Sequence, residues 1–151
     1  MKAISMSKHF ILSGLAATVV NLLMNAGAYF LFLKDVFEAN PPVSAAFYEQ
    51  LVRPPGQLIG WAMAATSLTM GFFIATVINW SGARTFVSGL KKGFIVGVLF
   101  WSSVNFGLYA SSNHFSQTGV FADLPCSATA MAVAAAVSAW VLGKGENKLN
   151  P

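Results

Sequence analysis

Charged residues are absent from four long stretches of the chain, and apolar side chains predominate in each of them. The four stretches are residues 10–33, 54–83, 93–122 and 124–143. A helix needs about 20 mostly apolar residues to cross the hydrocarbon layer of a membrane, so each stretch is long enough for one crossing. The pattern predicts four transmembrane helices, over about residues 10–33, 58–80, 93–110 and 124–142.

The predicted fold class is therefore an all-α membrane protein in which four transmembrane helices form an antiparallel bundle. No internal repeat or second domain is found, and residues 1–151 are interpreted as a single transmembrane domain. The longest connection, residues 34–57, is interrupted by prolines near both of its ends. Between them, residues 43–52 are interpreted either as a short amphipathic helix on the membrane surface or as an ordered loop.

The composition excludes several classes of protein. The chain is 56% hydrophobic and 9% charged, whereas about 25% of residues are charged in an ordinary soluble domain, and the mean hydropathy is +0.63. A soluble enzyme, a disordered chain and a nucleic-acid-binding domain are therefore not expected. The net charge of +4 does not indicate a nucleic-acid partner, because the basic residues form no patch interleaved with aromatic side chains.

The positions of the basic residues predict the orientation of the helices. Short segments rich in lysine and arginine stay on the cytoplasmic side of a membrane. Seven of the nine basic residues fall on one face of the predicted bundle: Lys2, Lys8, Arg84, Lys91, Lys92, Lys144 and Lys148. Both termini are therefore expected in the cytoplasm, and residues 34–57 are expected to form an extracytoplasmic loop.

Six polar side chains in the predicted spans, which contain no charged residue, are candidates for a polar site. They are Asn21, Asn25, Thr66, Thr69, Asn105 and Tyr109. One interpretation is a small polar cavity for a neutral solute or a lipid headgroup, and the other is hydrogen bonding between helices. The lack of intramembrane charge argues against proton-coupled transport, ion pumping and acid–base catalysis inside the membrane.

Glycines recur at helical spacing and predict close contacts between helices. Small residues are enriched where helices approach each other in a membrane. The glycines assigned to helix packing are Gly14, Gly60, Gly71, Gly89, Gly93 and Gly97. The same motifs mediate contacts within a chain or between chains, so a homo-oligomer is an alternative to packing inside one bundle.

Cys126, His114 and Asp123 lie close together in the sequence, on the side opposite most basic residues. A thiolate beside a histidine can act as a nucleophile or as part of a metal site. The alternative is that Asp123 caps the fourth helix, Cys126 is a small apolar residue and His114 is solvated. The spacing matches no metal-ligand pattern, so no catalytic, metal or cofactor site is predicted.

Three segments resemble small four-helix bacterial inner-membrane proteins of a domain family of unknown function. In such proteins, the second helix ends in a short aromatic and basic turn before a glycine-rich third helix. The corresponding residues here are 79–86, 89–93 and 140–144. The resemblance implies a location in the bacterial inner membrane and implies no activity, cofactor or site residue.

The expected function is that of an accessory or interaction protein without enzymatic activity of its own. It would act through helix packing and the loop at residues 34–57, with the lipid bilayer and either a homo-oligomer or a larger membrane complex as partners. The alternative is a small transporter or channel for a neutral or lipid-like solute. A third hypothesis is a membrane enzyme that uses Cys126 and His114.

Overall fold

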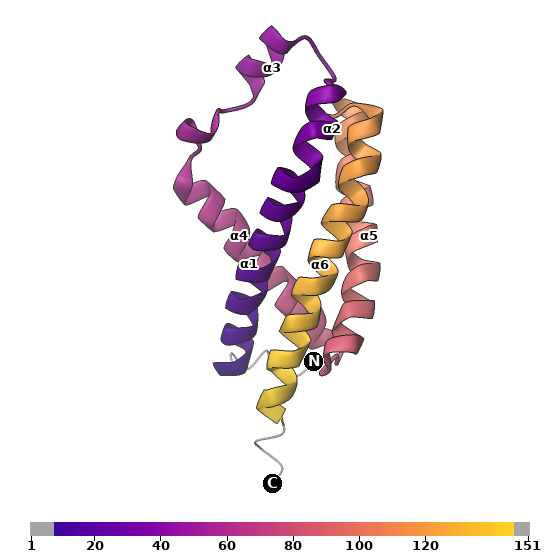
Figure 1. Ribbon diagram of the computed structural model, residues 1–151. Helices are drawn as coiled ribbons and strands as arrows, with labels where there is room; N and C mark the ends of the chain where they lie inside the picture. Colours follow the sequence, from indigo (N-terminus) through magenta and orange to yellow (C-terminus); the bar gives the residue numbers. More distant parts are fainter. Residues whose placement is uncertain (1–7, 147–151) are drawn as a thin grey trace.

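The computed structural model describes residues 8–146, and within that range it contains helices and no strands (Figure 1). The basic residues Lys2 and Lys148 lie outside the described residues. The helical elements are α1 (Lys8–Ala28), the π-helical segment η1 (Tyr29–Leu33), α2 (Lys34–Ala39), α3 (Ala45–Leu51), the 3-10 turn η2 (Pro55–Gln57), α4 (Gly60–Trp80), α5 (Phe86–Ser111) and α6 (Gln117–Glu146).

Four of these helical stretches are long and apolar enough to cross a membrane. They are Lys8–Ala39, Gly60–Trp80, Phe86–Ser111 and Gln117–Gly145. The prediction of four candidate spans in an all-helical chain is therefore confirmed, and it indicates a multi-pass membrane protein.

Three of the four long helices extend further than the sequence pattern predicts, whereas α4 does not. The first runs without a break through η1 to Ala39, α5 begins at Phe86 instead of residue 93, and α6 begins at Gln117 instead of residue 124. Charged residues mark where hydrocarbon ends, whereas a helix continues until a cap or a proline stops it. At the start of α5 this cap is a capping box, in which Thr85 and Ser88 satisfy each other's backbone N–H groups.

Glycines let α5 and α6 approach each other closely. A methyl group added at Gly93 would lie 2.3 Å from Cβ of Ala135, and one added at Gly97 would lie 2.9 Å from the carbonyl oxygen of Ala128. A methyl group added at Gly89 would lie 2.5 Å from Cβ of Ala139. The three glycines are buried, so they pack helices within this chain.

A second close approach joins α1 and α4 where the two helices cross. A methyl group added at Gly71 would lie 2.0 Å from Oγ1 of Thr18, and one added at Gly14 would lie 2.6 Å from the ring of Phe72. Gly60, by contrast, has no atom within 4 Å of such a methyl group. Its expected packing role therefore has no counterpart inside this chain.

Helix α6 is the most buried of the four candidate spans, and it packs against α1, α4 and α5. Alanines dominate its buried positions, among them Ala128, Ala132 and Ala135. The hydroxyls of Ser13 on α1 and Ser138 on α6 are 2.7 Å apart and fully buried. Because the two hydroxyls hydrogen-bond to each other, each has a partner that lipid could not provide.

Helix α4 packs on the other helices along only part of its length. Its buried residues Gly71, Ile74, Ala75 and Ile78 all lie in the half that leads to Trp80. None of residues 60–70 is buried, and Figure 1 shows this half diverging from the other helices. We call residues 60–70 the far half of α4.

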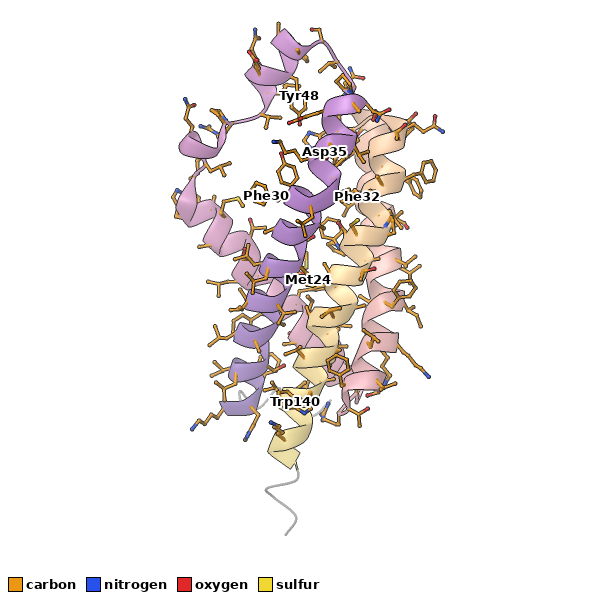
Figure 2. All side chains as sticks on the ribbon, in the orientation of Figure 1. Met24, Phe30, Phe32, Asp35, Tyr48 and Trp140 are labelled. Atoms are coloured by element: carbon orange, nitrogen blue, oxygen red, sulfur yellow. The ribbon has the colours of Figure 1, made fainter. Side chains whose placement is uncertain are left out.

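The segment between α2 and α4, which we call the arm (residues 40–59), returns the chain to the far half of α4. It contains α3, which confirms that the predicted segment within residues 43–52 is helical, although α2 takes the first residues of the expected loop. Tyr48 of α3 lies near the first helix (Figure 2). Burial raises the pKa of its phenol, and the neighbouring Tyr29 raises it further.

Candidate functional site

A buried polar cluster joins α5 to α6 at the end of the molecule nearer the arm. The Asn105 amide nitrogen donates a hydrogen bond of 2.7 Å to Oδ2 of Asp123, and the Ser127 hydroxyl donates to both carboxylate oxygens at 3.1 and 3.2 Å. Asn105 is only 1% exposed, Ser127 is buried and Asp123 is half-buried. We call these three residues the Asp123 cluster.

The Asp123 cluster contradicts the interpretation of Asp123 as the cap of the fourth helix. Asp123 does not cap the fourth helix, because α6 begins at Gln117 and the Ser116 hydroxyl instead accepts the Gly119 N–H at 3.1 Å. The fourth candidate span also contains a carboxylate. At 1.5 Å per residue, Asp123 lies about 25 Å along α6 from Trp140, so it is near the edge of a hydrocarbon layer about 30 Å thick.

Asn105 lies in the half of α5 that ends at Ser111. It lies about 28 Å along α5 from Phe86 at 1.5 Å per residue, at the level of Asp123. The sequence contains a signal for one contact of the Asp123 cluster. Asp123 and Ser127 are four residues apart, which puts them on one helix face. Asp123 was left out of the predicted span at residues 124–142 because it ends a charge-free stretch.

The two asparagines of α1 are not part of the Asp123 cluster. Asn25 donates to the backbone oxygen of Asn21 at 2.8 Å, so its amide stabilises its own helix. Asn21 is 8% exposed, and its side-chain oxygen has no hydrogen-bond partner. The buried indole nitrogen of Trp101 also has none. Helices α1 and α5 do not pack against each other, and no hydrogen bond connects Asn21 to Asn105 among the described residues.

The remaining predicted polar residues face outward. Thr66 and Thr69 are exposed on the far half of α4, and Tyr109 is exposed on α5. The structure therefore does not bring the six polar candidates together. It buries Asn21 and Asn105 on different helices and leaves the two threonines on a surface that no other part of residues 8–146 covers.

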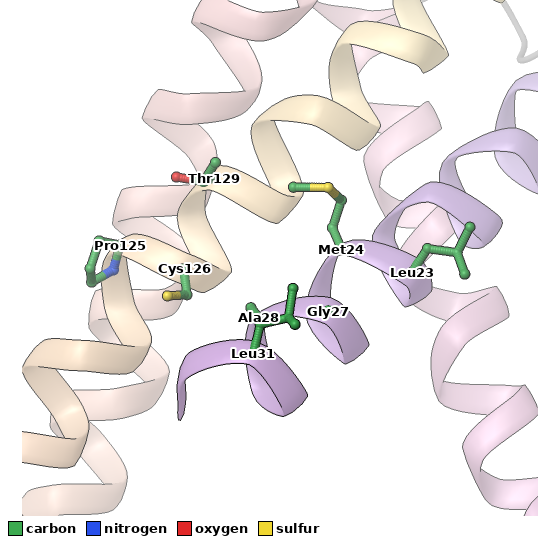
Figure 3. Close-up of a pocket in the computed structure, with 8 residues that line it drawn as sticks. All are labelled: Leu23, Met24, Gly27, Ala28, Leu31, Pro125, Cys126 and Thr129. Carbon is green, nitrogen blue, oxygen red and sulfur yellow. The ribbon is translucent and has the colours of Figure 1, made fainter. Parts of the chain in front are cut away.

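A groove of about 460 Å³ lies between the first helix and α6 (Figure 3). Two irregularities flank it: Leu31 belongs to the π-helical segment, and Pro125 lies inside α6, where it cannot donate a helical hydrogen bond. The lining is mainly apolar and consists of Leu23, Met24, Gly27, Ala28, Leu31, Pro125, Cys126 and Thr129. None of the six predicted polar residues lines this groove.

Cys126 and His114 occupy different environments. Cys126 lines the groove within α6, whereas His114 is exposed in the connection before that helix and packs edge-on against Phe115, with ring centres 4.6 Å apart. Phe115 packs in turn on Phe37 of α2. Among residues 8–146, no group of three or more His, Cys, Asp or Glu side chains is placed to hold a metal ion.

The arrangement offers two kinds of surface, a laterally open apolar groove and an uncovered helix half, together with one buried acidic cluster. The groove suits an apolar ligand, because concave and mainly apolar surfaces with few polar groups are typical of ligand sites. Comparisons of the chain with protein-family models, with curated proteins and with solved structures find no match.

Proposed function

We propose that this chain is a non-enzymatic accessory protein of the bacterial inner membrane that binds a second membrane protein through the far half of α4 and the arm. In this proposal both termini lie in the cytoplasm and the arm lies on the extracytoplasmic side, as the positive-inside rule predicts from the basic residues. The partner is a protein with at least one apolar helix that packs against α4.

The observation that carries the proposal is the change along α4 from a packed half to an uncovered half. Small residues continue through both halves, with Gly60, Ala64 and Ser67 in the far half and Gly71 at the crossing with α1. Such residues allow close helix contacts in membranes. Gly71 makes this contact within the chain, so the far half retains the same surface for a helix from another chain.

Polar groups on the far half support a protein partner over lipid alone. Thr66 and Thr69 are exposed and have no hydrogen bond to other described residues, whereas the exposed Ser67 hydroxyl donates to the carbonyl of Met63 at 2.9 Å. Unsatisfied polar groups are costly in hydrocarbon. A neighbouring helix with a polar side chain would satisfy the threonines.

Photo-crosslinking in native membranes tests this proposal. We expect a diazirine amino acid at Met63, which is 50% exposed and lies beside Gly60 and Ser67 on the far half of α4, to give one discrete protein adduct. The same residue at Leu99, which is 67% exposed on α5, should give none, because that face contacts lipid. An adduct of twice the mass of the chain would identify the partner as a second copy.

A pair of variants separates binding from folding. Gly60→Leu with Ala64→Leu should abolish the Met63 adduct without unfolding the protein, because Ala64 is exposed and no atom lies near Gly60. Gly107→Leu, at an equally open glycine on α5, should leave the adduct intact. Indistinguishable adduct patterns from Met63 and Leu99 would contradict the proposal.

The groove favours a second candidate function, the binding of a lipid-like molecule. Its apolar lining and its position between two candidate spans suit a hydrocarbon chain better than a polar solute. The same crosslinker at Ala28, which lines the groove, distinguishes this function. A single lipid species enriched in the Ala28 adduct relative to the Leu99 adduct would support it, and the bulk lipid mixture at both positions would oppose it.

A further inference from the structure

The arm carries two opposite charges that the chain itself does not pair. Glu49 in α3 and Arg53 are exposed and four residues apart, a spacing that joins opposite charges on one helix face. The helix ends before Arg53, however, because Val52 is extended, with φ of −106° and ψ of 125°. Lys34 and Glu38 have the same spacing, remain in one helix and form an ion pair at 3.8 Å. Glu49 and Arg53 have no such partner among the described residues, so both are available to another chain.

The polar side chains on the far half of α4 can be satisfied by the same side chains of a second copy. Residues 60–70 contain no charged side chain, and the exposed Thr66 and Thr69 have no hydrogen bond to other described residues. A hydroxyl both donates and accepts, so it can pair with another hydroxyl. The chain already uses this pairing where α1 meets α6, since the Ser13 and Ser138 hydroxyls are 2.7 Å apart and buried. A surface whose unsatisfied side chains are hydroxyls therefore matches itself.

The direction of α4 leaves room for a second copy along its far half. This half diverges from the other helices (Figure 1), and within it Gly60 and Ala64 are exposed and lie one turn apart. Small residues at this spacing let two membrane helices cross closely. Because such a crossing involves only the far half, it does not bring together the basic residues that follow the packed half, Arg84, Lys91 and Lys92. Repulsion between these like charges therefore does not oppose the pairing.

We propose that the partner bound by the far half of α4 and the arm is a second copy of this chain, in a two-fold dimer. The inference rests on the proposed function, because it names the partner of the same surface. A two-fold interface uses one surface twice, so that surface must be complementary to itself. Glu49 of each copy lies opposite Arg53 of the other, which gives two equal ion pairs. Exposed ion pairs are weak and are screened by salt, so they select the arrangement while helix contact provides most of the affinity.

Energy transfer between labelled copies in vesicles tests the proposal. Chains fused at the C-terminus to a donor or an acceptor fluorescent protein are reconstituted together in phosphatidylcholine and then diluted with lipid. We expect transfer above the level of random collisions, and association weaker by about tenfold in Gly60→Leu with Ala64→Leu, because larger side chains overpack the crossing. Gly107→Leu, where an added methyl group also has no atom within 4 Å, should associate like the unchanged chain.

Charge reversals test the ion pairs of the arm with the same measurement. Glu49→Arg alone and Arg53→Glu alone place like charges opposite each other, so each should weaken association at low salt, by about fivefold per lost pair. Mixing the two variants restores both ion pairs between unlike copies, so transfer from donor-labelled Glu49→Arg to acceptor-labelled Arg53→Glu should recover. Lys91→Glu makes the same charge change as Arg53→Glu at an exposed residue of α5, and it should have no effect.

Recovery of transfer in the mixture of the two charge-reversed variants supports the two-fold dimer. No recovery in the mixture would overturn the proposal, as would equal transfer in the unchanged chain and in Gly60→Leu with Ala64→Leu. The proposed function fails by a different result, the lack of a discrete adduct at Met63. A discrete Met63 adduct whose added mass is not that of a second copy would retain the proposed function and overturn only the dimer.

Discussion

Replacing Gly93 with leucine is expected to destabilise the protein by about 3 kcal/mol, at the upper end of the usual cost of overpacking a tight contact. A single methyl group at this position would already lie 2.3 Å from Cβ of Ala135 and 3.1 Å from Cα of Ala132. Neither atom can move without shifting the backbone of α6. Because α6 packs against the other three candidate spans, a shift there affects the whole assembly.

The matched control for Gly93 lies on the same helix. Gly107 has no atom within 4 Å of an added methyl group, so Gly107→Leu should change stability by less than about 0.5 kcal/mol or improve it, since leucine favours helices more than glycine does. Unfolding of both variants by denaturing detergent in mixed micelles gives the comparison. Equal stabilities of the two variants would mean that the close contact between α5 and α6 does not exist.

Replacing Asn105 with leucine is expected to cost about 2–3 kcal/mol, because hydrogen bonds to charged groups are stronger than neutral ones and a half-buried acceptor loses its donor. The bond in question joins the Asn105 amide to Asp123 over 2.7 Å. Ser127 would remain as the only side chain that donates to the carboxylate. Tyr109→Phe, which alters an exposed group one turn along α5, should have little effect.

A double-mutant cycle isolates this interaction. Combining Asn105→Leu with Asp123→Leu should cost less than the sum of the two single changes, because the pair removes a donor and its acceptor together. We expect a coupling free energy of at least about 1 kcal/mol. Additive losses would show that Asn105 and Asp123 do not interact in the membrane-embedded protein.

The four candidate spans could be predicted from the sequence because charged side chains are excluded from hydrocarbon, and this exclusion leaves a direct pattern. The helix ends could not be predicted in the same way. Lys91 and Lys92 mark a membrane boundary, but α5 begins several residues before them, where Thr85 and Ser88 form a capping box. A boundary set by solvent and a boundary set by hydrogen bonding need not coincide.

The divergence of α4 could not be predicted because its two halves have similar sequences. Small residues occur in both, and only tertiary contacts decide which of them pack. Gly71 packs closely against Gly14 and Thr18 at the crossing with α1, whereas a methyl group added at Gly60 would have no atom within 4 Å. The structure places Gly89, Gly93 and Gly97 close to α6, and it places no other helix next to Gly60 within residues 8–146.

The candidate sites were predicted less completely than the fold. The sequence left two interpretations of this region open, a Cys126–His114 pair or a cap formed by Asp123, whereas the structure pairs Asp123 with Asn105. These two residues are 18 positions apart, and their contact depends on how α5 and α6 align. Without the helix ends, that alignment could not be calculated from the sequence.

The measurement that tests the central claim most directly is a spin-label scan of α4 in lipid bilayers. Single cysteines are introduced at residues 61–79 in a Cys126→Ser background, and the collision rate of each label with oxygen is recorded. We expect uniformly high rates along the far half of α4, and low rates recurring at Gly71, Ile74, Ala75 and Ile78, which are buried. Low rates at helical spacing throughout residues 61–69 of the isolated protein would contradict the account, because the far half would then be packed within its own chain.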